Sequence, residues 1–361
     1  RLGFTSKKTM QIAQQLYEGI NIGSNRVGLI TYMRTDSTRI SQTALDDVRK
    51  WIGEKYPDEL PSEAIEYSVG KKAQDAHEAI RPTYTTYTPD YVKDYLSRDQ
   101  LRLYSIIWER FVSSQMNNAK TKTTSVDIKA GDAIFRVSGS KLIEKGFYKV
   151  VKILSSKENT TGNVPSLKID EKLNSQKFYP EQHFTQGPAR YTDASIVKTL
   201  EEKGIGRPST YATIIETIQK RLYVELIKSS ENSKTKVFIP TEQGFLTDKK
   251  LQEYFSSIIN VSYTAEMEKD LDEIAEGNKE SVKELRAFYD KFIPLLDQAY
   301  ENMEKMAPQK TGEICPDCGS ELVYRNGKFG RFISCSNYPT CKYTKNEAQE
   351  DNKTEDVCPN C

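Results

Sequence analysis

Apolar residues recur at helical spacing over the first 117 residues of the chain. One face lies near the start, a second follows Ser41 and a third follows Ser97, and serine is a favoured helix N-cap. The three faces are Met10, Ala13, Leu16, Tyr17 and Ile20; Ala44, Leu45, Val48, Trp51 and Ile52; and Leu101, Tyr104, Trp108, Phe111 and Val112. This pattern predicts a helical domain over residues 1–117, with a short apolar strand over 28–32.

The hydrophobic period changes after residue 117. Short β-prone segments separated by Gly, Asn and Ser replace the helical pattern, which predicts a β-rich module over residues 118–187. The expected strands are 123–128, 133–137, 147–153 and 167–169.

Helical spacing returns over residues 188–306. The expected order is a helix over 194–203, a Gly-Ile-Gly turn, a helix over 208–221 and a hairpin around 229–234, as in a winged helix. Pro208 suits a first helical turn, and the N–H groups at this helix start would face an anion such as a DNA phosphate. A helix-turn-helix used only for packing is the alternative. The patterns together predict an α+β multidomain protein.

Asp270-Leu271-Asp272 superficially matches an Asp-x-Asp metal motif. Met267, Leu271 and Ile274 nevertheless repeat at helical spacing around it, which predicts an ordinary amphipathic helix.

All six cysteines lie near the end of the chain. Cys315 and Cys318 form one close pair, and Cys335 and Cys341 form another after sixteen intervening residues. This spacing predicts a four-thiolate zinc ribbon over 311–346, with a redox pair as the alternative. Aromatic and cationic residues lie between the pairs, and they suit either single-stranded nucleic acid or the ribbon's own core. Residues 347–361 read as an acidic linker and the start of a second ribbon, with Cys358 and Cys361 as its first knuckle.

The segment from Ile30 to Thr38 carries the most specific chemistry. Tyr32 offers a nucleophilic phenol, but tyrosine, with an ordinary pKa of about 10, is almost wholly protonated at neutral pH. Arg34 could assist the phenol and hold phosphate oxygens bidentately, which lysine does less well. A half-buried structural tyrosine is the plainer interpretation of the motif alone.

Four segments in order carry a family resemblance. Tyr32-Met-Arg-Thr-Asp-Ser37 resembles the active-site signature of bacterial type IA DNA topoisomerases, and Gln74 to Thr83 resembles their histidine segment. Glu202 to Ala212 is similar to their DNA-facing helix start. Ile239 to Gly244, with Tyr263 to Glu268, is similar to the end of the same core. The resemblance covers roughly residues 1–305.

The resemblance implies a fold and a set of site residues. It implies winged-helix-like helical domains, the first bearing the tyrosine, and a β-rich arch segment of the type IA toroidal core, followed by a small zinc ribbon. Tyr32 is then the nucleophile and Arg34 the transition-state clamp. The implied DNA contacts are His77, Thr31, Thr35, Asp36, Gln14, Glu18, Arg207, Ser209 and Thr210.

The implied reaction is transesterification of single-stranded DNA. Tyr32 forms a 5′-phosphotyrosine, another strand passes, and the freed 3′-hydroxyl reverses the attack, relaxing negative supercoils without ATP. Type IA enzymes bind Mg²⁺ through an N-terminal Toprim domain, and no segment here matches it. We therefore expect these 361 residues to be part of a longer enzyme and to bind DNA without relaxing it.

Composition adds limits on partners and location. With 52 basic and 51 acidic residues, the formal charge is +1, so a DNA-binding surface must be local. No membrane span or signal peptide is visible. We expect a soluble, cytoplasmic, nucleoid-associated monomer that binds single-stranded and negatively supercoiled DNA.

Two other functions compete with this interpretation. A tyrosine recombinase would need its tyrosine near the C-terminus, whereas Tyr32 comes early. A non-catalytic single-stranded nucleic acid binding protein could use the winged helix and ribbon alone. The sequence leaves open the cleavage-site preference, any RNA activity, the number of later ribbons and whether Cys358 and Cys361 bind zinc.

Overall fold

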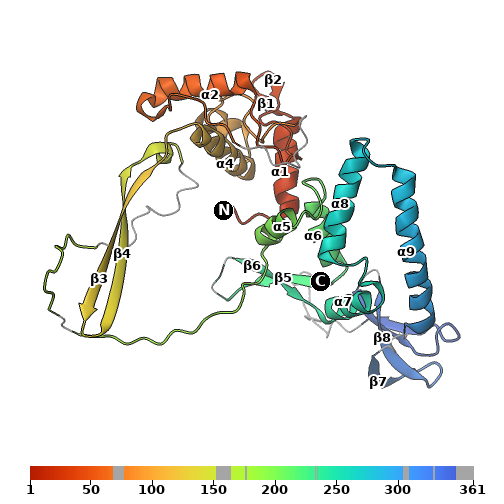
Figure 1. The fold of residues 1–361 in the computed structure, drawn as a ribbon. Helices are drawn as coiled ribbons and strands as arrows, with labels where there is room; N and C mark the ends of the chain where they lie inside the picture. The colour runs from red at the N-terminus through yellow and green to blue at the C-terminus, as the bar shows by residue number, and fades with distance from the viewer. Residues whose placement is uncertain are drawn as a thin grey trace, which may run out of the picture. The chain divides into compact units, whose positions relative to one another are not determined.

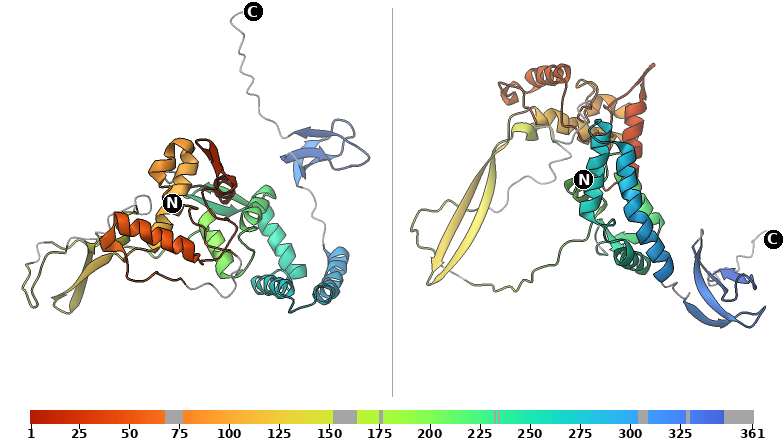
Figure 2. Two further views of the ribbon diagram at one scale, coloured as in Figure 1. Left: turned by 90° about the horizontal axis from the view of Figure 1, so that it is seen from above. Right: turned by 45° about the vertical axis from the view of Figure 1, so that its right-hand side comes forward.

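The computed structural model describes residues 1–67, 77–151, 164–174, 177–231, 233, 235–303, 309–327 and 330–346. It contains two compact units, Arg1–Phe288 and Tyr289–Cys361 (Figures 1 and 2). Residues 74–76 of the predicted histidine segment and the predicted linker with Cys358 and Cys361 lie outside the described residues.

The first 117 residues form the predicted helical region. Its core lies between three helices, whose buried side chains include Leu16, Val48, Ile52, Trp108 and Val112. The elements are α1 (Ser6–Glu18), β1 (Ile20–Ile22), β2 (Asn25–Val27), α2 (Gln42–Lys55), η1 (Pro57–Glu59), α3 (Pro89–Val92), η2 (Lys93–Tyr95) and α4 (Arg98–Ser114). The strand expected over 28–32 is reduced to a single bridge between Ile30 and Pro82.

Helix α4 holds the irregular segment that precedes it. The Tyr104 hydroxyl donates to the Tyr87 carbonyl at 2.6 Å, and Trp108 Nε1 donates to the Thr85 carbonyl at 3.0 Å. Burial raises the pKa of Tyr104, so this phenol stays a neutral donor. The backbone at Thr85 and Tyr87 is thereby fixed by buried side chains of α4.

The β-rich region is a two-stranded antiparallel ribbon, yellow in Figure 1, made of β3 (Lys120–Ala130) and β4 (Ala133–Glu144). Both predicted strands are present and longer than expected. The strand expected over 147–153 is wrong over its described part, because the 3-10 helix η3 (Gly146–Lys149) begins there. The strand expected over 167–169 is also wrong, because this stretch pairs with no described strand.

The region after residue 190 has the predicted winged-helix order. Its elements are α5 (Asp193–Glu202), α6 (Tyr211–Lys220), β5 (Val224–Lys228) and β6 (Lys236–Pro240), followed by α7 (Glu242–Phe255), α8 (Val261–Ala275) and α9 (Ser281–Asn302). Strands β5 and β6 pair antiparallel as the wing. Thr192 closes a capping box at the start of α5, which fixes where that helix begins.

The last described region is a small antiparallel sheet in the order β10-β9-β8-β7. The strands are β7 (Lys310–Ile314), β8 (Glu321–Gly327), β9 (Gly330–Cys335) and β10 (Thr344–Asn346). Over all the described ranges, no helix combines the length and apolar character needed to cross a membrane.

Candidate active site and zinc centre

The segment that ends at Tyr32 is held by backbone hydrogen bonds on both sides. Leu29 N donates to the Leu16 carbonyl of α1 at 2.8 Å, and Thr31 N donates to the Arg81 carbonyl at 2.9 Å. Gly28 allows this close approach, because a Cβ there would lie 2.7 Å from the Tyr17 carbonyl oxygen. The backbone before Tyr32 therefore has a fixed place between α1 and residues 79–83.

The Thr31 side chain joins the same two segments. Its hydroxyl donates to the Ala79 carbonyl at 2.8 Å and accepts the Arg81 N–H at 3.0 Å. A hydroxyl has one hydrogen to donate, so these bonds use that donor and one of its acceptor positions. In this structure Thr31 positions the loop that carries His77.

Two rings flank the proposed nucleophile. Tyr32 is 38% exposed, and its ring lies 5.5 Å from the ring of Tyr17 and 5.4 Å from that of His77, centroid to centroid. Tyr17 meets it edge to face, an arrangement that aromatic quadrupoles favour. The structure thus brings together two predicted site residues, Tyr32 and His77, and adds Tyr17, which the sequence had assigned only to a helix face.

The turn after Tyr32 is ordered by its own hydroxyls. Thr35 Oγ1 accepts the Ser37 N–H at 3.0 Å, and the buried Ser37 hydroxyl accepts the Arg39 N–H at 3.2 Å. Arg34 and Asp36 are exposed on this turn. Within the described ranges Arg34 has neither a hydrogen bond nor an ion pair, so its guanidinium is accessible to an anion.

Gln14 and Glu18 lie on α1 within one turn of Tyr17. The Gln14 amide donates to the Glu18 carboxylate, so these predicted DNA contacts bind each other here. Residues three and four apart share a helix face. Gln14 therefore shares a face of α1 with Tyr17 and with Glu18, whereas Glu18 directly follows Tyr17 in the helix.

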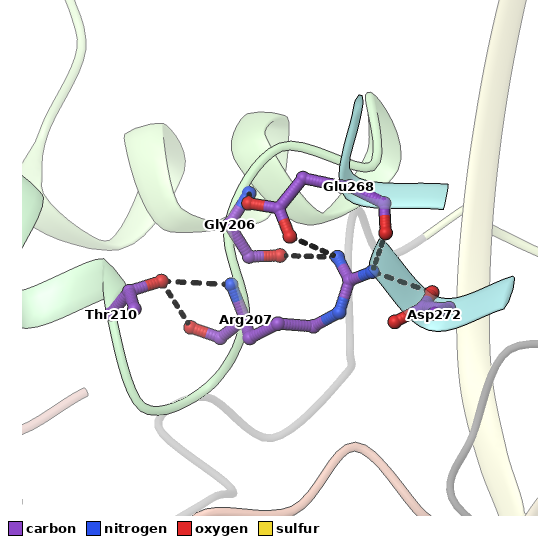
Figure 3. Close-up of polar contacts among 5 residues, drawn as sticks. All are labelled: Gly206, Arg207, Thr210, Glu268 and Asp272. Carbon is purple, nitrogen blue, oxygen red and sulfur yellow. Dashed lines mark hydrogen bonds and ion pairs between the residues drawn. The ribbon is translucent and has the colours of Figure 1, made fainter. Parts of the chain in front are cut away.

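Arg207 points toward Glu268 and Asp272 of α8 (Figure 3). Its Nη2 donates to Asp272 Oδ2 at 2.6 Å, and its Nη1 pairs with Glu268 Oε2 at 3.2 Å. Nearby, Ser209 and Thr210 are exposed. The sequence missed both α8 carboxylates as partners of this turn, although it correctly predicted Asp272 in an ordinary helix.

Tyr211 is the first residue of α6, and charged groups of the tyrosine turn and of α8 both act on its phenol. Burial and then the charge of Glu201 raise its pKa, and the carboxylates of Asp36 and Glu268 act in the same direction. Asp36 follows Tyr32 by four residues, while Glu268 belongs to α8. The start of α6 is therefore near enough to the tyrosine turn to feel its charge.

The four predicted zinc ligands come together in the ribbon. Their sulfur atoms all lie within 4.8 Å of one another, with Cys315–Cys341 at 3.7 Å and Cys318–Cys335 at 3.3 Å. Four thiolates on a tetrahedron at about 2.3 Å from Zn²⁺ would be roughly 3.8 Å apart. A hydrogen bond from the Ser320 side chain, then its backbone, lowers the pKa of Cys318 to about 6. The donor set and spacing fit zinc.

Arg325 of β8 lies 5.5 Å from the centre of the Tyr338 ring. A guanidinium over an aromatic face is a favourable contact, and Tyr338 is 57% exposed. Tyr324 instead packs on the small core formed by Cys315, Leu322 and Ile333. The aromatic residues of the ribbon thus divide between its core and its surface.

Comparisons with known proteins identify the family of the chain. The sequence model described as DNA topoisomerase matches residues 1–285, and the one described as topoisomerase DNA binding C4 zinc finger matches residues 312–350. The chain is 46% identical over 348 residues to DNA topoisomerase 1 of Treponema pallidum (strain Nichols), covering 96% of this chain and 47% of that protein. It is similar to the structure of full-length topoisomerase I from Thermotoga maritima, with a TM-score of 0.69 and 34% identity, covering 96% of this chain and 55% of that one.

The chain belongs to the bacterial type IA DNA topoisomerase family, and it carries that family's zinc ribbon. It spans about half the length of the Treponema and Thermotoga proteins.

Proposed function

We propose that this chain is the strand-cleaving part of a type IA topoisomerase that relaxes negative supercoils without ATP. The observation that carries the proposal is Tyr32, a partly exposed phenol on a fixed backbone, with His77 beside it and the accessible Arg34 two residues on. Strand passage and religation follow from the family's activity.

The proposed chemistry exchanges one phosphoester for another. The Tyr32 oxygen loses its proton and bonds to phosphorus, the bond from phosphorus to the 3′ oxygen breaks, and that oxygen takes up a proton. Arg34 holds the phosphate oxygens as charge builds up on them, as a guanidinium can do with two parallel N–H donors. His77 contacts the phosphate next to the reacting one.

The remaining predicted DNA contacts differ in whether their side chains are exposed or already bound to other groups of the protein. Asp36 and Ser209 are exposed and can face DNA directly. Gln14 and Glu18 would have to exchange their mutual hydrogen bond for DNA, and the exposed Thr210 hydroxyl its bond to the Arg207 carbonyl. Thr31 and Thr35 act by holding the backbone on either side of Tyr32. Magnesium would position DNA and the leaving group when bound by the Toprim domain, and no step above depends on it.

The 361 residues alone are expected to bind single-stranded DNA without relaxing supercoils. We expect a monomer associated with the nucleoid in the cytoplasm. The competing function, non-catalytic binding of single-stranded nucleic acid, is favoured only by the ribbon surface at Arg325 and Tyr338.

Trapping the covalent adduct tests the proposal. In the full-length protein with magnesium, denaturant should trap labelled oligonucleotide on the wild type and none on Tyr32→Phe, because only the phenolic oxygen differs. Tyr17→Phe is the matched control, since it changes the neighbouring ring's hydroxyl and should keep the adduct. An undiminished adduct in Tyr32→Phe would reject the proposed nucleophile. The absence of any adduct with wild type would favour the competing function, non-catalytic binding of single-stranded nucleic acid.

A further inference from the structure

The guanidinium of Arg207 is already surrounded by oxygen atoms of the protein. Nη1 donates to the Gly206 carbonyl at 2.8 Å and pairs with Glu268 Oε2 at 3.2 Å. Nη2 donates to the Glu268 carbonyl at 3.1 Å and to Asp272 Oδ2 at 2.6 Å. Arginine has four terminal N–H bonds and one on Nε. Three hydrogen bonds and one further ion pair therefore already engage the two terminal nitrogens.

A bidentate phosphate contact would break part of this arrangement. Such a contact uses two parallel N–H donors, at least one of them on a terminal nitrogen. The side chain of Arg207 is 30% exposed, and those of Glu268 and Asp272 are 25% and 39% exposed. These partly buried ion pairs are less screened by solvent than surface pairs. DNA binding by Arg207 would therefore displace at least one of these contacts.

The same carboxylate also holds the backbone of the turn. Glu268 Oε1 accepts the Gly206 N–H at 3.1 Å, and Thr210 Oγ1 accepts the Arg207 N–H at 2.9 Å (Figure 3). Gly206 has φ +74° and would bring a Cβ to 3.1 Å from Thr210 Oγ1, so the turn is tight at this point. One α8 side chain thus fixes both the backbone and the guanidinium of the α5–α6 turn.

We propose that Arg207 is a positioning residue, which ties the α5–α6 turn to Glu268 and Asp272 of α8 and so sets the start of α6 for DNA. The phosphate contact at this site then comes from the exposed Ser209 and not from the Arg207 guanidinium. This inference rests on the proposed function, because it assumes that the start of α6 faces DNA.

The salt dependence of DNA binding distinguishes a positioning role of Arg207 from a direct phosphate contact. For single strands, each phosphate neutralised by a cation contributes about 0.7 to the slope of log affinity against log salt. We would measure binding of a fluorescent single-stranded oligonucleotide to the 361-residue chain from low to moderate salt. The variants are Arg207→Gln, Arg207→Lys and the double variant Glu268→Gln/Asp272→Asn.

If Arg207 is a positioning residue, the affinities and salt slopes of these variants should follow one pattern. Arg207→Gln and Arg207→Lys should both weaken binding about tenfold with the salt slope unchanged, because the single ammonium of lysine cannot reproduce the contacts of the two terminal guanidinium nitrogens. The double variant should also weaken binding, although it removes negative charge. Glu266→Gln is the matched control on the same helix, because Glu266 is exposed and its loss reports only the general effect of charge.

The opposite pattern would overturn the positioning role of Arg207 and leave the proposed function standing. If Arg207 contacts phosphate, Arg207→Lys should bind nearly as well as wild type, Arg207→Gln should lose about 0.7 from the slope, and the double variant should bind more tightly because it frees the guanidinium. Failure of wild type to bind the oligonucleotide would instead overturn the proposed function, and this inference with it. Circular dichroism of each variant separates loss of the turn from loss of the fold.

Discussion

The hydroxyl of Thr31 is expected to contribute measurably to the stability of the protein. Thr31→Val keeps the shape of the side chain but leaves the Arg81 N–H and the Ala79 carbonyl without their partner. An unsatisfied, partly buried group costs about 1–3 kcal/mol, so the midpoint of thermal unfolding should fall by several degrees. Thr31→Ser is the control, because it restores both bonds. Equal stability of the valine and serine variants would contradict this role.

At the scale of single residues, the sequence predicts which residues lie near one another better than it predicts the partners that each side chain contacts. Tyr32 and His77 were expected at one site and lie ring to ring. Arg207 was expected to face DNA, but its acceptors lie 61 and 65 residues further along the chain. Short motifs carry local chemistry, whereas a partner supplied by a distant helix depends on tertiary packing that no local pattern encodes.

Two helix caps give a prediction at the scale of elements. Both Ser41 and Ser97 occupy N-cap positions, but only Ser97 has its side chain bonded to the helix, in a complete capping box with Gln100. Ser97→Ala should therefore destabilise the helical region by about 1 kcal/mol, while Ser41→Ala should cost markedly less. Denaturant unfolding of the two variants checks the difference. A larger loss for Ser41→Ala would mean that the cap geometry is not what sets stability here.

The elements also show where the hydrophobic pattern of the sequence is no longer sufficient to predict secondary structure. Helices were predicted well, because their spacing and caps are local properties. The segment after Gly146 has the apolar composition of a strand, but the Phe147 N–H bonds to the Asn117 carbonyl and Val150 is buried in the helical core. Residues 167–169 have no described strand to pair with, and Ile169 is 95% exposed. A strand needs a neighbour, and the sequence of one segment does not supply it.

At the scale of the whole molecule, the two compact units predict two independent responses to metal removal. The ribbon has a small core, centred on Cys315, Leu322, Ile333 and Cys335, so most of its stability should come from zinc. Structural zinc sites bind with apparent free energies of about 10–16 kcal/mol at neutral pH, and this energy is coupled to folding. The larger unit has its own extended core, so we expect it to stay folded when zinc is removed.

Chelation should therefore unfold residues 309–346 while leaving the unit Arg1–Phe288 folded. Hydrogen exchange read by mass spectrometry should show loss of protection in β7 to β10 after strong chelation, and unchanged protection in α1, α2 and α4. Zinc released per chain should be close to one ion, and Cys335→Ser should reproduce the effect without a chelator, because it removes a buried thiolate. Acidification should act in the same direction, since the ligands must lose their protons to bind. Protection in the ribbon that survives complete removal of zinc would show that its apolar core alone holds the four strands, and the cysteines would then need another explanation.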